Sequence, residues 1–203
     1  MRIETEPIHS MKILVVALVW FLLALLIGAS GLLASIPPPF QQAFLFSLVI
    51  VLLLLFWRSF LFREWLLSVD IRVLVLIHLS RFVGIYFLVL YSRGDLPYAF
   101  AVPGGWGDIA VAATAIPVSL FLQNEGAISR RILFLWNVFG LVDILLVIAT
   151  ASRLAMANPE SMVALTRLPL SLLPTFLVPI IVFTHIIIFV RLLTSRRKIY
   201  RMF

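Results

Sequence analysis

Apolar runs of about twenty residues recur along this chain, and they limit what it can fold into. The first extends from about Ile13 to Leu33 and is longer than the roughly 7–15 apolar residues of a secretory signal peptide. About twenty apolar residues are needed for a helix to cross the hydrocarbon core of a bilayer. Charged residues make up 12% of the chain, about half the share in ordinary soluble domains. The pattern therefore predicts an integral membrane protein whose spans are helices.

Six such segments follow one another, separated by turn-forming or charged residues. The fold predicted is all-α: one transmembrane domain over residues 1–203, a bundle of six helices that cross the membrane. The expected spans are residues 13–33, 43–57, 71–91, 106–122, 132–151 and 170–193.

The distribution of basic residues predicts how the spans are oriented. Six spans place both termini on one side, and if that side is the cytoplasm, twelve Lys and Arg residues fall inside and three outside. This asymmetry is what the positive-inside rule expects of a protein in the cytoplasmic membrane with both termini inside. Those inside are Arg2, Lys12, Arg58, Arg63, Arg72, Arg130, Arg131, Arg191, Arg196, Arg197, Lys198 and Arg201; those outside are Arg93, Arg153 and Arg167.

Several polar side chains lie within the predicted spans, where exposure to lipid would cost a charged group about 2.5–3.5 kcal/mol or more. They are expected to face the bundle interior as a buried polar centre of His78, Arg81, Asn137, Asp143 and His185. At about 1.5 Å per residue, Arg81 and Asp143 lie at the same depth, about 16 Å from the cytoplasmic end of their spans. The matched depth predicts an ion pair between Arg81 and Asp143.

The two histidines of the polar centre also share a depth. His78 and His185 each lie about 12 Å from the cytoplasmic face. Two imidazoles on facing helices could ligate haem b or a metal ion, although a tetrahedral zinc site needs more ligands than these. The alternative is that each histidine forms an interhelical hydrogen bond with a carbonyl or hydroxyl group.

A glycine-rich stretch, VPGGWGD at residues 102–108, is predicted as a turn that leads into the fourth span. It lacks the lysine and hydroxyl of a Walker loop, so nucleotide binding is not indicated. Asp108 is expected to cap the positive end of the span. With Gly104, Gly105 and Gly107, it would form a lid at the outer membrane face.

Other features exclude functions more firmly than they suggest one. The chain has no cysteine, so it forms no disulfide, thiolate metal site or Cys nucleophile. It also lacks the HExxH and GxSxG motifs, and an enzyme is the last class to consider. The basic residues flank apolar runs and do not line one face, which argues against nucleic acid. The basic end, SRRKIYR at residues 195–201, is expected to contact anionic lipid headgroups.

Five stretches, taken in order, resemble a group of small bacterial integral-membrane proteins that carry no assigned activity. These are RFVGIYFLVLY, GDLPYAF, GGWGD, WNVFGLVD and LPTFLVPIIVFTH. The likeness covers about residues 81–185, roughly half of the chain. It implies a bacterial cytoplasmic-membrane protein whose distinctive residues lie in spans three to six.

Three function classes are consistent with these features. In the first, the polar centre binds or transports a small solute, an ion or a proton through protonation of Asp143 modulated by Arg81. A chain this short would favour a homodimer for transport. Transport would also require a water-reachable cavity that touches Arg81 and Asp143. In the second, the protein is structural or accessory, and the charge pair only fixes helix register. In the third, His78 and His185 hold haem b for electron transfer; otherwise no cofactor is predicted.

Overall fold

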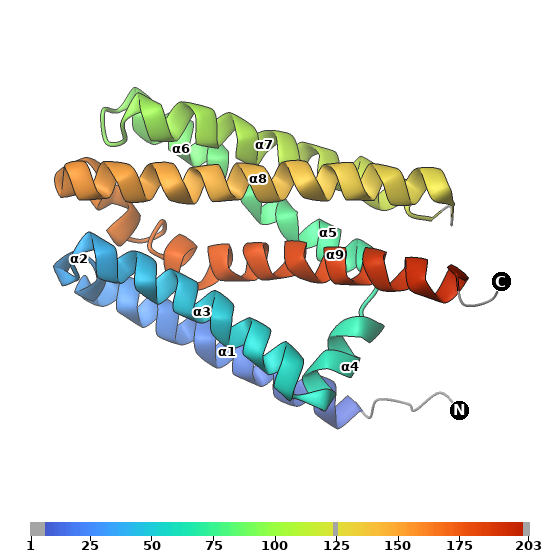
Figure 1. Cartoon of the computed structure of the whole chain (residues 1–203). Helices are drawn as coiled ribbons and strands as arrows, with labels where there is room; N and C mark the ends of the chain where they lie inside the picture. The colour runs from blue at the N-terminus through green and yellow to red at the C-terminus, as the bar shows by residue number, and fades with distance from the viewer. Residues whose placement is uncertain (1–6, 124–125, 201–203) are drawn as a thin grey trace. The chain divides into compact units, whose positions relative to one another are not determined.

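The computed structural model in Figure 1 describes residues 7–123 and 126–200, with side chains for 11–123 and 126–194. The described part of the chain is all-α and confirms the predicted fold class, because six of its helical segments are long and apolar enough to cross a membrane. The segments are Met11–Ser30, Pro38–Arg58, Ile71–Ser92, Tyr98–Phe121, Ala127–Ala157 and Leu173–Thr194. The basic run at 195–201 lies outside the described side chains.

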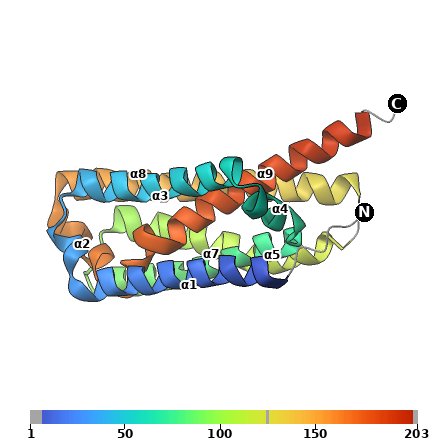
Figure 2. The same ribbon diagram turned by 90° about the horizontal axis from the view of Figure 1, so that it is seen from below.

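The chain forms two compact units, the first within Met1–Val69 and Leu165–Pro179. Its helices are α1 (Pro7–Ser30), α2 (Leu32–Ser35), α3 (Pro38–Arg58) and α4 (Phe60–Ser68), followed much later in the chain by the π-helix η3 (Leu173–Leu177). Gly31, with φ of 71°, provides the left-handed turn that ends α1. The segment η3 contacts both α1 and α3 and lies between them in Figure 2.

The Thr175 carbonyl of η3 cannot accept the usual hydrogen bond from the residue four positions later, because that residue is Pro179, which has no N–H. Trp20 of α1 supplies one, because its Nε1 donates to the Thr175 carbonyl at 3.0 Å. The Trp20 and Phe176 rings meet edge to face, with centroids 4.9 Å apart. Trp20, near the middle of α1, therefore satisfies a backbone group of η3 and also packs on it, as an irregular helix in a membrane requires.

The second unit, within Asp70–Ala164 and Ile180–Phe203, carries the predicted polar residues. Its third span is built of α5 (Ile71–Leu76), the 3₁₀ segment η1 (Ile77–Phe82) and α6 (Val83–Ser92). The others are α7 (Tyr98–Phe121), α8 (Ala127–Ala157) and α9 (Val178–Tyr200), with the 3₁₀ segment η2 (Pro159–Thr166) after α8. The central helix is α7, which packs against α5, η1, α6 and α8.

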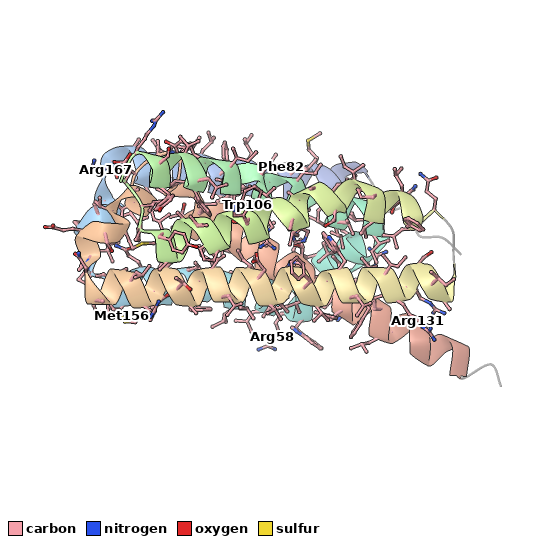
Figure 3. The ribbon with its side chains drawn as sticks, turned by 90° about the horizontal axis from the view of Figure 1, so that it is seen from above. Arg58, Phe82, Trp106, Arg131, Met156 and Arg167 are labelled. Atoms are coloured by element: carbon pink, nitrogen blue, oxygen red, sulfur yellow. The ribbon has the colours of Figure 1, made fainter. Side chains whose placement is uncertain are left out.

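Helix α8 is the longest element of this unit. Figure 3 shows it running lengthwise, with Arg131 near its first turn and Met156 near its last. Its 31 residues extend about 46 Å, well beyond the roughly 30 Å of the hydrocarbon core. One face is buried and includes Trp136, Asn137 and Gly140, whereas large apolar side chains such as Leu146 are exposed on the other. An exposed apolar face on a membrane span contacts the lipid bilayer.

Three expectations about the predicted helices need correction. The third span is not a continuous α-helix, because η1 interrupts it. The fifth is longer at both ends than the predicted 132–151. The fourth begins at Tyr98 and not at Trp106, so the glycine-rich stretch predicted as a turn is helical. Tertiary packing overrides the turn preference of these glycines, because their missing side chains let α7 approach its neighbours closely.

Asp70 starts the third span, and its cap can be tested directly. Its Oδ1 accepts from the Arg72 backbone N–H at 2.8 Å, and the Arg72 guanidinium pairs with the same carboxylate. The hydrogen bond from the Arg72 side chain lowers the pKa of Asp70 to about 2. Replacing Asp70 with Ala is expected to lower the free energy of unfolding by about 1 kcal/mol, whereas Asp70→Asn retains an oxygen for the cap and loses less.

Thermal unfolding followed by circular dichroism in detergent measures this difference. The contribution of Asp70 should be complete above the ordinary carboxyl pKa of about 4 and should disappear as the pH falls towards 2. Equal losses in the Ala and Asn variants would show that the cap does not stabilise α5.

Candidate functional site

The 3₁₀ segment η1 places two of the predicted polar residues on one side of the third span. A 3₁₀-helix has three residues per turn, so side chains at positions i and i+3 eclipse each other. His78 and Arg81 have this spacing, and both are buried. A short 3₁₀ stretch inside a longer helix frequently marks a functional or strained position.

Arg81 donates hydrogen bonds to three groups on two other helices. Its Nε donates to Asp108 Oδ1 of α7 at 2.6 Å, and its Nη1 donates to the Gly140 carbonyl of α8 at 2.9 Å. Its Nη2 donates to Asp143 Oδ2, also of α8. The structure thus brings Arg81 and Asp143 together, as their matched depths predict, and adds Asp108 as a second anion. We refer to Arg81, Asp108 and Asp143 as the charge cluster.

The charge cluster is buried unevenly. The Arg81 and Asp108 side chains are 1% and 4% exposed, whereas that of Asp143 is 15% exposed. Asp143 also lies against Gly107 of α7, where any β-carbon would overlap its Oδ1 atom. Gly107 therefore makes room for this carboxylate, and Asp143 is the member of the cluster nearest to the surface of the unit.

The formal charges of the cluster do not cancel. One guanidinium faces two carboxyl groups, which leaves one negative charge in excess if both are ionised. A buried charge without a partner costs several kcal/mol, so the excess has to be neutralised by a proton or by a bound cation. The cluster also has more hydrogen-bond acceptors than donors, because a carboxylate only accepts.

The predicted role of Asp108 as a helix cap is wrong. Helix α7 begins at Tyr98, after Pro97, and Asp108 lies nearly three turns inside it with its side chain on Arg81. Gly104, Gly105 and Gly107 are likewise within the helix and form no lid loop. Counted from Tyr98, at the opposite face from the start of the third span, Asp108 is about 15 Å deep. In a hydrocarbon core of about 30 Å this is the midplane, the depth predicted for Arg81, so the correct helix start would have revealed the pair.

The two predicted histidines lie side by side next to the charge cluster. The imidazole pair, as we call His78 of η1 and His185 of α9, has ring centroids 4.2 Å apart. His185 Nδ1 is 2.7 Å from Asn137 Oδ1, and Asn137 Nδ2 donates to the His185 carbonyl at 3.0 Å. His78 Nε2 is 3.3 Å from Thr184 Oγ1. Gly140 connects the two groups, because its carbonyl accepts from Arg81 and its Cα faces His185.

The imidazole pair does not fit the predicted haem site. Two axial histidines bind on opposite sides of a porphyrin, and rings in contact at 4.2 Å leave no space for the macrocycle. A metal ion held by two adjacent imidazoles would need further ligands. In the described ranges, no group of three or more His, Cys, Asp or Glu side chains is arranged to supply them.

Trp136 and two threonines belong to the site but were not predicted as part of it. Trp136 Nε1 donates to Thr114 Oγ1 of α7 at 3.0 Å. The indole ring meets His78 edge to face, with centroids 5.1 Å apart. Thr184, on α9, contacts His78 through its hydroxyl group. Trp136, Gly140 and Asp143 follow one another at intervals of four and three residues, so they lie on one face of α8. This spacing could have identified Trp136 as part of the site from the sequence.

The comparisons with known proteins identify a family but no activity. No curated protein matches the chain, and no solved structure does either. A protein-family profile matches residues 38–193, which include the second to fifth spans, the sixth except for its last residue, and every member of the charge cluster and the imidazole pair. The chain therefore belongs to the family described as a domain of unknown function, DUF8737.

Proposed function

We propose that this multi-pass membrane protein binds a proton or a small cation at the charge cluster and carries it, alone or with a small solute, across the bilayer. The observation that supports this most is that two carboxyl groups within the spans, Asp108 and Asp143, share the single buried guanidinium of Arg81. An intramembrane carboxylate whose partner is already shared commonly marks a proton or ion pathway. Protonation of Asp143 would weaken its hold on Arg81 and leave the Gly140 carbonyl as the remaining acceptor of Arg81 on α8.

A structural role is the second candidate, and the burial of Arg81 favours it. Its side chain is 1% exposed, and each of its three nitrogens donates to a protein oxygen. One guanidinium holding η1, α7 and α8 would fix the relative position of these helices without any turnover. The 15% exposure of the Asp143 side chain instead favours the first candidate, because its carboxyl group can exchange a proton or cation with its surroundings.

A count of protons bound by the purified protein separates the two candidates. Titrated between about pH 8 and 5, the wild type is expected to take up one proton per chain more than Asp143→Asn, because the Asn variant leaves Arg81 and Asp108 as a neutral pair. Asp70→Asn is the matched control: Asp70 has a pKa of about 2 and stays ionised over this range, so the count should equal that of the wild type.

Equal counts in the wild type, Asp143→Asn and a second variant, Asp108→Asn, would favour the structural candidate. For transport, the same proteins in liposomes with a pH-sensitive dye inside are given a pH gradient. Faster dissipation in the wild type than in Asp143→Asn supports a proton pathway, and identical rates contradict it. Thermal unfolding of each variant shows whether it is folded.

We infer in addition that the six spans form one transmembrane domain in the cytoplasmic membrane of a bacterium, with both termini in the cytoplasm. The excess of Lys and Arg in alternate connections supports this orientation. For transport by so small a chain, a homodimer is the favoured assembly. Reporter fusions at each terminus and at the 93–97 and 158–166 connections test the orientation.

A further inference from the structure

We propose that the imidazole pair is a second binding site for the proton that the charge cluster requires, held on the lone pairs of His185 Nε2 and His78 Nδ1. This inference rests on the proposed function, and it names where in the fold the proton resides besides Asp143. The argument depends on which ring nitrogens carry hydrogen, and neighbouring residues determine that.

The tautomer of His185 is fixed by Asn137. A backbone carbonyl only accepts, so the Asn137 nitrogen must be the atom that faces the His185 carbonyl at 3.0 Å. The Asn137 oxygen then faces His185 Nδ1 at 2.7 Å, and Nδ1 has to be the N–H group. In a neutral imidazole the other nitrogen carries the lone pair. His185 Nε2 is therefore an acceptor.

The tautomer of His78 follows from Thr184. The Thr184 hydroxyl has one hydrogen, which it donates to the Ile181 carbonyl at 2.9 Å. Towards His78 Nε2, 3.3 Å away, it acts as the acceptor, so Nε2 carries the hydrogen. His78 Nδ1 is then the second lone pair, on a ring that touches His185.

Both lone pairs are buried without a donor. Neither His78 nor His185 has exposed surface, and His78 Nδ1 and His185 Nε2 have no hydrogen-bond partner in the described structure. Two acceptors cannot bond to each other, and an unsatisfied buried polar group is costly. One added proton changes this, because a protonated imidazole becomes a donor to the neighbouring neutral one.

Of the charges in the adjacent cluster, the Arg81 guanidinium repels such a proton and the carboxylates attract it. The ionisable groups of that cluster are Arg81 of η1, Asp108 of α7 and Asp143 of α8, whose formal charges sum to one negative when both carboxyl groups are ionised. A proton on either imidazole brings the centre to zero. In the transfer, the proton leaves the Asp143 carboxyl oxygen, which becomes a carboxylate, and bonds to an imidazole nitrogen; no electrons are exchanged.

Gly140 keeps the acceptor face of His185 open. A β-carbon at this position would lie 2.6 Å from His185 Cε1 and 3.0 Å from Nε2. The Gly140 carbonyl accepts from Arg81, so the backbone of this residue contacts both the charge cluster and the imidazole pair. Gly140→Ala should therefore disturb the second site without removing any charge.

Nitrogen NMR of histidine-labelled protein in bilayers tests the inference. His9→Gln leaves only the imidazole pair labelled. At about pH 8 we expect two N–H and two lone-pair signals, with His185 Nδ1 as an N–H group. At about pH 5, one lone-pair signal should change to that of a protonated nitrogen. In Asp143→Asn and in Gly140→Ala this change should be lost. Gly104→Ala is the matched control, because its β-carbon meets only Val147, at 3.2 Å.

The outcomes distinguish this inference from the proposed function. Unchanged imidazole signals, with one proton still taken up per chain, overturn the second site and leave the charge cluster as the proton carrier. A hydrogen on His185 Nε2 at about pH 8 also overturns it, since the Asn137 argument would then be wrong. If neither the signals nor the proton count changes with pH, both proposals fail.

Discussion

Replacing Arg81 with Leu is expected to reduce the free energy of unfolding by about 3–5 kcal/mol, a loss larger than removal of either aspartate should cause. The substitution leaves Asp108 and Asp143, both held by the same guanidinium, without a cation. It also removes the donor to the Gly140 carbonyl. Unfolding in mixed detergent micelles, followed by tryptophan fluorescence, measures the loss.

Compensating substitutions show how the charges are shared. If Asp143 were the sole partner, Arg81→Leu combined with Asp143→Leu would restore most of the stability. Because Asp108 also pairs with Arg81, we expect the double variant to recover only part of it, and Asp108→Leu in addition to recover the rest. Full recovery in the double variant would contradict this, and would indicate that Asp108 already carries the proton in the wild type.

The fold could be predicted from the sequence because the membrane restricts the alternatives. A long apolar run has to be a helix there, so the length and spacing of the runs give the number of spans. The predictions that were wrong concerned local structure. Proline and glycine at 103–105 suggest a turn in water, but within a bilayer they continue α7 from Tyr98 to Phe121. Neighbouring helices and altered hydrogen bonding accommodate such residues in membrane helices.

Comparing the depths of polar residues along the predicted spans identified only part of the site. It paired Arg81 with Asp143 and His78 with His185, since helices rise at a constant rate along their axes. Asp108 was missed because its depth was counted from the wrong start. The roles of Asn137 and Thr184 depend on helix rotation and on which atoms donate. Neither hydropathy nor depth contains that information.

Gly84→Ala is the other substitution from which we expect a large effect, because it tests how closely α6 and α7 approach. A β-carbon at Gly84 would overlap the Gly105 carbonyl oxygen and lie 2.8 Å from the β-carbon of Asp108. The obstacle is backbone, so the helices would have to separate. Overpacking of this kind costs about 1–3 kcal/mol, and here it also draws Asp108 away from Arg81.

The matched control is Gly104→Ala on α7, whose β-carbon would meet only side-chain atoms of Val147, the nearest at 3.2 Å, and no backbone. We expect it to unfold like the wild type in mixed micelles and to bind the same number of protons. Gly84→Ala should lose both stability and proton uptake, since a displaced Asp108 no longer shares the Arg81 charge. Normal uptake in a destabilised Gly84→Ala would mean that proton binding does not depend on the close approach of α6 and α7, and that this contact serves only packing.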